Sequence, residues 1–168
     1  MPAKKDKEIN PLTLKDTPLA YHFNELSKKY YGAVSKHFEE LDLERNYFIL
    51  NFISKHKFIK QQTLANLLNM DKTRIVHVID YLTRKGLVKR EISVDDRREH
   101  KIIVTKKAAK YIEKISAGFE MLNKIALKGF TKNEQQLFFN MLEKIDNNIS
   151  SLPSENYSLK FVKSKRIK

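Results

Sequence analysis

Two segments of the chain, one near each end, carry mostly apolar residues at alternating steps of four and three, which predicts two long amphipathic helices. The first is expected to begin at Thr17 and Pro18, because threonine is a good N-cap and proline fits the first helical position. It runs to about Phe38, and the second runs from Thr105 to about Lys128. The stripe positions are Leu19, Phe23, Leu26, Tyr30, Ala33 and His37 in the first helix, and Ala108, Ile112, Ile115, Phe119, Leu122 and Ala126 in the second.

Three shorter helices are predicted between these two segments. Asp42 or Glu44 opens a helix from Arg45 to about Lys55, which is apolar nearly all round and is therefore expected to be buried on most sides. A short helix follows from Gln61 to Leu68. The next runs from Lys72 to Lys85 and turns an inward stripe to the core, made of Ile75, Val78, Ile79 and Leu82.

Turn signals separate these elements. Asn69 stands where the chain must turn sharply, and asparagine tolerates the left-handed conformation. Asp71 is expected to cap the following helix, and Gly86 to end it. Beyond Gly86, two short β-branched and apolar runs flank a charged stretch, which indicates a β-hairpin. The runs contain Leu87, Val88 and Ile92 on one side and Lys101 to Val104 on the other.

A last helix is predicted after Gly129, because Thr131 and Glu134 form a capping box. One face of this helix is apolar, with Leu137, Phe138, Met141, Leu142 and Ile145. The two ends of the chain lack such periodicity. We expect residues 1–16 to form an irregular arm and the basic tail, residues 151–168, to be disordered or accessory.

Composition narrows the classes of partner. The net charge is +13, and the stretch from Lys57 to Lys110 carries eight of these positive charges, which points to a polyanionic partner. The absence of cysteine excludes disulfides and thiolate metal sites. The amino terminus is charged, and the most apolar stretch, Tyr47 to Ile53, is far shorter than the ~20 residues that span a bilayer. We expect a soluble, cytoplasmic protein with no membrane partner.

The order of helix, short turn, helix and basic hairpin is typical of a winged helix-turn-helix. The expected fold class is mainly α with a small β-hairpin wing. In this arrangement the helix from Lys72 to Lys85 enters the major groove of DNA. Its polar face supplies the candidate contacts Lys72, Thr73, Arg74, His77 and Tyr81, and the wing supplies Asp96, Arg97 and Arg98. Each set taken alone is also compatible with an ordinary solvated surface, and the combination favours DNA.

The segment from Asp71 to Thr105 resembles the core of the MarR-type (multiple antibiotic resistance regulator) transcription factors. It reads DKTRIVHVIDYLTRKGLVKREISVDDRREHKIIVT. The resemblance implies that Thr73, Arg74 and His77 lie at major-groove reading positions. It also implies that Asp96 pairs with Arg98, which enters the minor groove. His77 departs from the pattern, because relatives usually carry arginine there.

The resemblance further implies a homodimer in which the terminal helices of two subunits interlock. It divides the chain into a single domain, residues 17–150, between the arm 1–16 and the tail 151–168. Within the domain, 17–41 and 106–150 are dimerisation helices and 44–105 is the winged helix-turn-helix. The implied function is a sequence-specific repressor on a pseudo-palindromic operator, released by a small aromatic or apolar acid. The implied effector cleft is lined by Tyr30, Tyr31, His37, Phe48 and Phe52.

Two other function classes stay open on the sequence alone. A winged helix used for protein assembly would share the fold, although the cations of the recognition face and wing favour nucleic acid. An enzyme is disfavoured, because the chain has no phosphate-binding glycine loop, nucleophile elbow or HExxH motif. No catalytic residue, cofactor or metal site is predicted. The five histidines show no ligand spacing; they are His22, His37, His56, His77 and His100.

Overall fold

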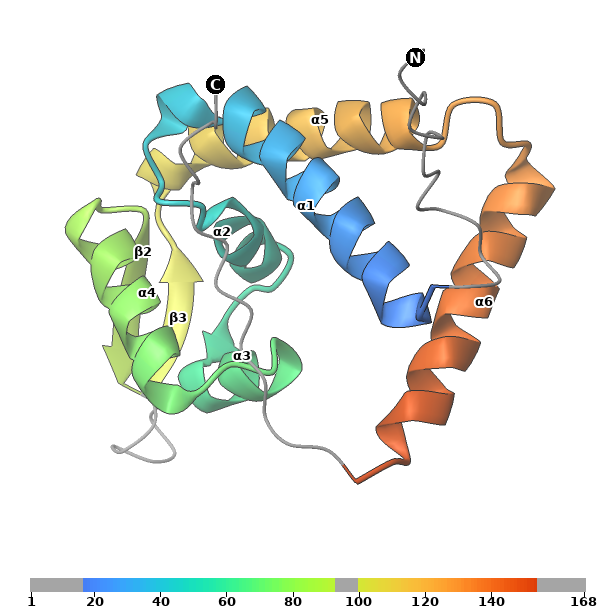
Figure 1. The fold of residues 1–168 in the computed structure, drawn as a ribbon. Coiled ribbons are helices and arrows are strands. Elements are labelled where there is room, and N and C mark those ends of the chain that lie inside the picture. Colours follow the sequence, from blue (N-terminus) through green and yellow to red (C-terminus); the bar gives the residue numbers. More distant parts are fainter. Residues whose placement is uncertain (1–16, 93–99, 154–168) are drawn as a thin grey trace, which may run out of the picture.

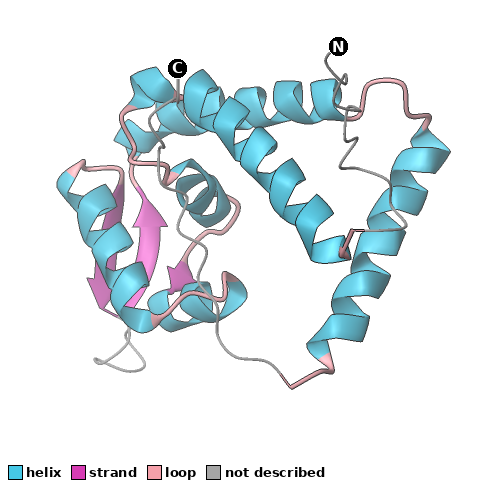
Figure 2. Cartoon of the chain, in the orientation of Figure 1, coloured by secondary structure: helices cyan, strands magenta, loops and turns pink. Residues whose placement is uncertain are grey.

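The computed structural model describes residues 17–92 and 100–153 and is mainly helical, with one small sheet (Figures 1 and 2). The predicted fold class is therefore confirmed. In chain order the elements are α1 (Leu19–His37), the 3-10 turn η1 (Glu39–Leu41), α2 (Tyr47–Ser54), β1 (Ile59–Lys60), α3 (Gln61–Leu67), α4 (Lys72–Arg84), β2 (Val88–Ile92), β3 (His100–Val104), the 3-10 turn η2 (Lys106–Ala108), α5 (Ala109–Ala126) and α6 (Lys132–Ser150).

The sheet has three antiparallel strands in the order β1-β3-β2. The predicted hairpin is formed by β2 and β3, with Val88 opposite Val104 and Ile92 opposite His100. The strand β1 was not predicted, because two residues are too few to show alternation. Its Ile59 lies opposite Ile102, which is fully buried at the centre of the sheet.

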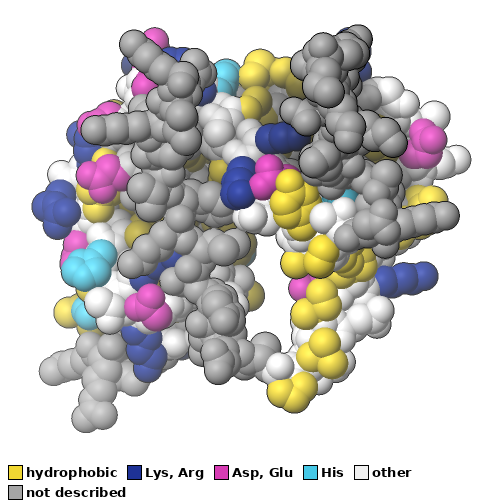
Figure 3. Space-filling view, viewed as in Figure 1, with side chains coloured by type: hydrophobic (Ala, Val, Ile, Leu, Met, Phe, Trp, Pro, Cys, Tyr) yellow, Lys and Arg dark blue, Asp and Glu magenta, His cyan; other side chains and the backbone are white. Residues whose placement is uncertain are grey.

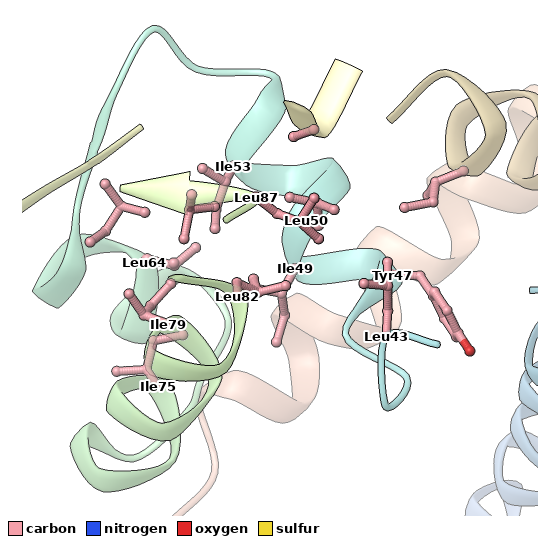
Figure 4. Close-up of a cluster of buried hydrophobic side chains, with 14 of the residues drawn as sticks. Leu43, Tyr47, Ile49, Leu50, Ile53, Leu64, Ile75, Ile79, Leu82 and Leu87 are labelled. Atoms are coloured by element: carbon pink, nitrogen blue, oxygen red, sulfur yellow. The ribbon is translucent and has the colours of Figure 1, made fainter. Parts of the chain in front are cut away.

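The main hydrophobic core lies among α2, α3, α4 and the sheet, as Figure 4 shows. The apolar helix α2 contributes Tyr47, Ile49, Leu50 and Ile53 to this core, which confirms that it is buried on most sides. Phe48 is the exception and is exposed. Because the core holds α3 and α4 against the sheet, the helix-turn-helix is a rigid unit.

The terminal helices bury little of their apolar surface. Val34 is the one fully buried residue of α1, and Ile115 and Gly118 are those of α5. In the part of the chain that the structure describes, α6 buries no residue at all. Figure 1 shows α6 lying apart from the winged core, and Figure 3 shows a run of hydrophobic side chains along it. The described residues thus leave most of the predicted stripe of α6 uncovered.

Several predicted helix ends are confirmed and others shift. Thr131 and Glu134 form the expected capping box, and Asn69 adopts the left-handed conformation with φ of 46°. However, α1 begins at Leu19 with Pro18 at the N-cap position, and α2 begins only at Tyr47, after a linker in which Asp42 and Glu44 are left-handed.

Thr105 precedes the turn η2 as predicted, but its hydroxyl donates to the carbonyl oxygen of Gly86 at 2.7 Å instead of capping the helix. No helix of the described residues is long and apolar enough to cross a membrane.

Candidate nucleic-acid interface

The amino end of α4 is fixed by its cap and its buried stripe. The carboxylate of Asp71 accepts a hydrogen bond from the backbone N–H of Arg74 at 2.8 Å, which satisfies one of the free donors of the first turn. Ile75, Ile79 and Leu82 are buried against the core, so the opposite face of the helix is turned to solvent. Four of the predicted contact residues are exposed there: Lys72, Thr73, Arg74 and His77.

Three of these residues lie on two neighbouring lines along the helix. Successive residues of an α-helix are rotated by about 100°, so Thr73 and His77 share one line along the helix. Arg74 lies on the next line, which also contains Val78. Both Arg74 and Val78 line a large cleft of the described chain, whereas Thr73 and His77 do not. Arg74 therefore stands at the border between the outward face of α4 and the cleft.

The carboxyl end of α4 is tied to the linker that follows α1. The hydroxyl of Tyr81 donates to the carbonyl oxygen of Asp42 at 2.8 Å, and the Lys85 ammonium lies 2.5 Å from the Asp42 carboxylate. The hydrogen bond to Asp42 raises the pKa of Lys85, and burial raises the pKa of Tyr81. Tyr81 is thus engaged inside the chain, and its predicted contact with DNA stays a prediction.

Tyr81→Phe is expected to lower the free energy of unfolding by about 1 kcal/mol, because it removes one neutral hydrogen bond. DNA affinity is expected to change less than about threefold, since one hydrogen bond to an internal carbonyl leaves the exposed face of α4 intact. Urea denaturation and a gel shift on the same preparation measure both quantities. A large loss of DNA affinity without a loss of stability would instead place the Tyr81 hydroxyl on DNA.

A polar cluster that sequence reasoning missed holds α4 to the sheet. The Arg90 guanidinium on β2 lies 2.5 Å from the Asp80 carboxylate on α4 and donates to Gln61 on α3 at 3.3 Å. The hydrogen bond from Arg90 lowers the pKa of Asp80. Because the three residues come from three elements, no local sequence pattern could have revealed this contact. The cluster links α4 to the sheet and Arg90 to α3.

The predicted wing residues Asp96, Arg97 and Arg98 lie outside the described residues, but the strands that lead to them are described. The base of the wing is anchored to the end of α4. Besides the bond from Thr105 to Gly86, the Lys107 ammonium donates to the carbonyl oxygen of Lys85 at 2.8 Å. The base of the wing and the carboxyl end of α4 are therefore hydrogen-bonded to each other.

This cleft has a volume of about 1110 Å³ and lies between α1, α2, α4 and α5. Five residues are predicted to line an effector cleft, and three of them, Tyr30, Tyr31 and Phe48, line this cleft. The other two lie elsewhere. His37 lines a separate cavity of about 340 Å³, and the ring of Phe52 packs against that of His56 with centroids 5.2 Å apart.

Polar groups accompany the aromatic rings of this cleft. The Tyr30 hydroxyl donates to the side-chain oxygen of Asn123 at 2.7 Å, which links α1 to α5. Arg45 and Arg74 supply two cationic side chains, and Glu44 supplies one anionic side chain. Among the described residues, no group of three metal-binding side chains comes together.

The comparisons with known proteins agree with this geometry. Residues 44–100 match the model of the MarR family. A MarR-family transcriptional regulator from Listeria monocytogenes, solved in complex with 26mer DNA, is 25% identical with a TM-score of 0.74, and the match covers 80% of this chain and 90% of that one.

Two further solved structures share the fold. A MarR protein from Peptoclostridium difficile is 24% identical with a TM-score of 0.74, and the match covers 82% of this chain and 91% of that one. A structure of MarR itself is 23% identical with a TM-score of 0.70, covering 83% and 95%. Residues 44–100, which contain the helix-turn-helix, thus match the MarR family, and the fold of about 80% of the chain is shared with a solved MarR-family structure.

Proposed function

We propose that this protein is a homodimeric transcriptional regulator that binds double-stranded DNA in a sequence-specific way and represses by occupying a pseudo-palindromic operator. The observation that carries the proposal is the face of α4: Lys72, Thr73, Arg74 and His77 are all exposed at the amino end of a helix whose other face is locked in the core. Side chains at that end of a recognition helix reach base edges and phosphates. The DNA complex of the Listeria relative supports the same use of the fold.

Charge supports the same partner. The net charge of +13 favours binding to a polyanion, and phosphate contacts release counterions from DNA. Binding is therefore expected to weaken steeply as the salt concentration rises. A protein-assembly module of the same fold would have no such requirement for cations around its exposed helix.

A gel shift with the DNA upstream of the coding region, repeated at several salt concentrations, tests this proposal. Arg74→Ala is expected to weaken binding by about 1–3 kcal/mol and to relax the sequence preference. Lys124→Ala on α5 is the matched control, because it removes one exposed cation outside α4 and should leave the sequence preference unchanged. Binding that does not respond to salt, or an Arg74→Ala variant with wild-type affinity and preference, contradicts the proposal.

The second subunit is proposed from the apolar surface that one chain leaves uncovered. On α6, Leu137, Phe138, Phe139, Met141 and Ile149 are exposed, and Leu19 and Leu26 of α1 are exposed as well. Contiguous exposed apolar surface of this kind marks an interaction site, and a symmetric operator needs two recognition helices one turn of DNA apart. A second copy of the chain satisfies both requirements.

The cleft lined by Tyr30, Tyr31 and Phe48 is the proposed effector site. The aromatic rings and the two arginines of the cleft suit a small aromatic acid. The volume of the cleft is ample for such a molecule. A ligand bound in this cleft weakens DNA binding only if it binds more tightly to the conformation in which the two recognition helices of the dimer do not fit DNA.

Benzoate and related acids should raise the melting temperature of the wild-type protein. The rise should be smaller for the Phe48→Ala variant. Phe58→Ala is the control, because Phe58 is a similarly exposed ring outside this cleft. The absence of any thermal shift across the panel contradicts the effector proposal, and leaves the DNA proposal standing.

A further inference from the structure

One apolar side chain of α4 is turned outward. Val76 is 37% exposed, whereas Ile75, Ile79 and Leu82 of the same helix are at most 2% exposed. Within the described ranges, Val76 belongs neither to the buried cluster that holds α4 nor to the lining of the large cleft. Val76 therefore keeps more than a third of its surface open to solvent.

The exposed Val76 side chain lies among the residues of the proposed DNA face. A single exposed aliphatic residue on an ordinary surface needs no explanation. Val76, however, lies one turn beyond Lys72 and Thr73 and directly before His77, which are the exposed polar residues of the proposed DNA face. One turn after Val76, the Asp80 carboxylate accepts a hydrogen bond from Arg90 on β2. This bond holds the same side of α4 in a fixed orientation relative to the sheet.

The chemistry of the major groove contains one apolar feature that suits such a side chain. Thymine presents a C5-methyl group there, and the other three bases present hydrogen-bonding groups and no methyl. Valine cannot donate or accept a hydrogen bond, and its β-branched side chain is nearly fixed in one rotamer on a helix. It offers two methyl groups at a constant position, which is suited to contact with another methyl group.

We propose that Val76 is a specificity-determining residue that contacts the C5-methyl group of one thymine in each half-site. This inference rests on the proposed DNA-binding function. Val76 thereby selects an A·T pair by an apolar contact, while Thr73 and His77 supply polar contacts to neighbouring positions. Burial of one methyl group corresponds to a preference of about fourfold for thymine over a base that lacks the methyl. Two half-sites together correspond to a preference of about fifteenfold.

The test compares thymine with deoxyuridine, which lacks only that methyl group. Binding sites are first selected from a random duplex pool with the full-length wild-type protein, and each recurring thymine is then replaced by deoxyuridine. We expect wild-type affinity to fall about fourfold at one thymine of each half-site. The Val76→Ala variant should bind the thymine duplex as weakly as the wild type binds the deoxyuridine duplex, and should not distinguish the two.

Leu67→Ala is the matched control, because Leu67 is an exposed apolar residue of α3 and not of α4. This variant should keep the wild-type discrimination. Val76→Ala is expected to fold, since alanine has the higher helix propensity and the site is exposed, and circular dichroism checks this.

The inference is overturned if the wild type does not distinguish the two bases at any selected position, or if Val76→Ala discriminates as well as the wild type. If selection yields no bound duplex at all, the proposed function fails and the inference fails with it. That result is distinct from a selected site whose thymine methyl groups make no difference.

Discussion

The double variant Phe138→Glu, Met141→Glu is expected to be monomeric and to bind DNA at least 100-fold more weakly than the wild type. Both side chains are exposed on the apolar face of α6, at 39% and 52%. Two carboxylates at the centre of a subunit interface would be buried without partners, which is strongly unfavourable. A monomer reaches one half-site at a time and loses the gain that linked binding provides.

The same variant is expected to remain folded, since the described part of α6 takes no part in the hydrophobic core. Sedimentation or light scattering measures the oligomeric state, and circular dichroism checks the helix content. Gln136→Glu, Asn140→Glu is the matched control, because these residues lie on the opposite, polar side of α6 and add the same charge. A double variant on the apolar face that stays dimeric would show that α6 does not form the interface.

Gly118→Ala is expected to lower the free energy of unfolding by about 2 kcal/mol, although alanine is normally the better helix former. A Cβ atom at this position would lie 2.4 Å from the Phe38 ring and 2.8 Å from the His37 ring. Phe38 cannot move aside easily, since it is buried between Tyr47 and Phe119 with ring centroids at 4.9 and 5.3 Å. Overpacking costs up to about 3 kcal/mol, and a contact this close belongs at that end, so a propensity gain of about 1 kcal/mol leaves a net cost of about 2 kcal/mol.

Gly32→Ala on α1 is the matched control for this prediction. Gly32 is also in the interior of a helix, and in the described chain a Cβ atom there meets nothing within 4 Å. It should therefore stabilise the protein by about 0.5–1 kcal/mol, so the two substitutions have opposite signs. Thermal and urea unfolding measure both. If Gly118→Ala proved as stable as Gly32→Ala, α1 and α5 would not pack as closely at this crossing as the structure has them.

Local features of the fold could be predicted because their causes lie within a few residues. The capping box of Thr131 and Glu134, the cap at Asp71 and the left-handed turn at Asn69 all depend on neighbours in the chain. The inward stripe of α4 follows from helical periodicity alone. For the same reason the exposed positions of Lys72, Thr73, Arg74 and His77 could be predicted from the sequence.

Contacts between distant segments could not be predicted in this way. The polar position of Tyr81 on its helix predicts a DNA contact, which stays a prediction. The structure adds a contact that no local pattern reveals, because the linker after α1 brings the carbonyl oxygen of Asp42 to the Tyr81 hydroxyl. The effector residues were chosen as aromatic rings on predicted helices. Helix crossing angles then placed Tyr30, Tyr31 and Phe48 around one cleft and left His37 and Phe52 outside it.

The sequence by itself thus determined the order of the α-helices and the hairpin, the buried face of α4 and the polar residues opposite, since these depend on periodicity and on local hydrogen bonds. Only the tertiary structure decided that Arg74 borders the cleft, that Arg90 fixes Asp80 and that Gly118 admits no side chain. Each of these depends on how close two elements approach in space. That distance is set by the packing of the whole core and leaves no periodic signal along the chain.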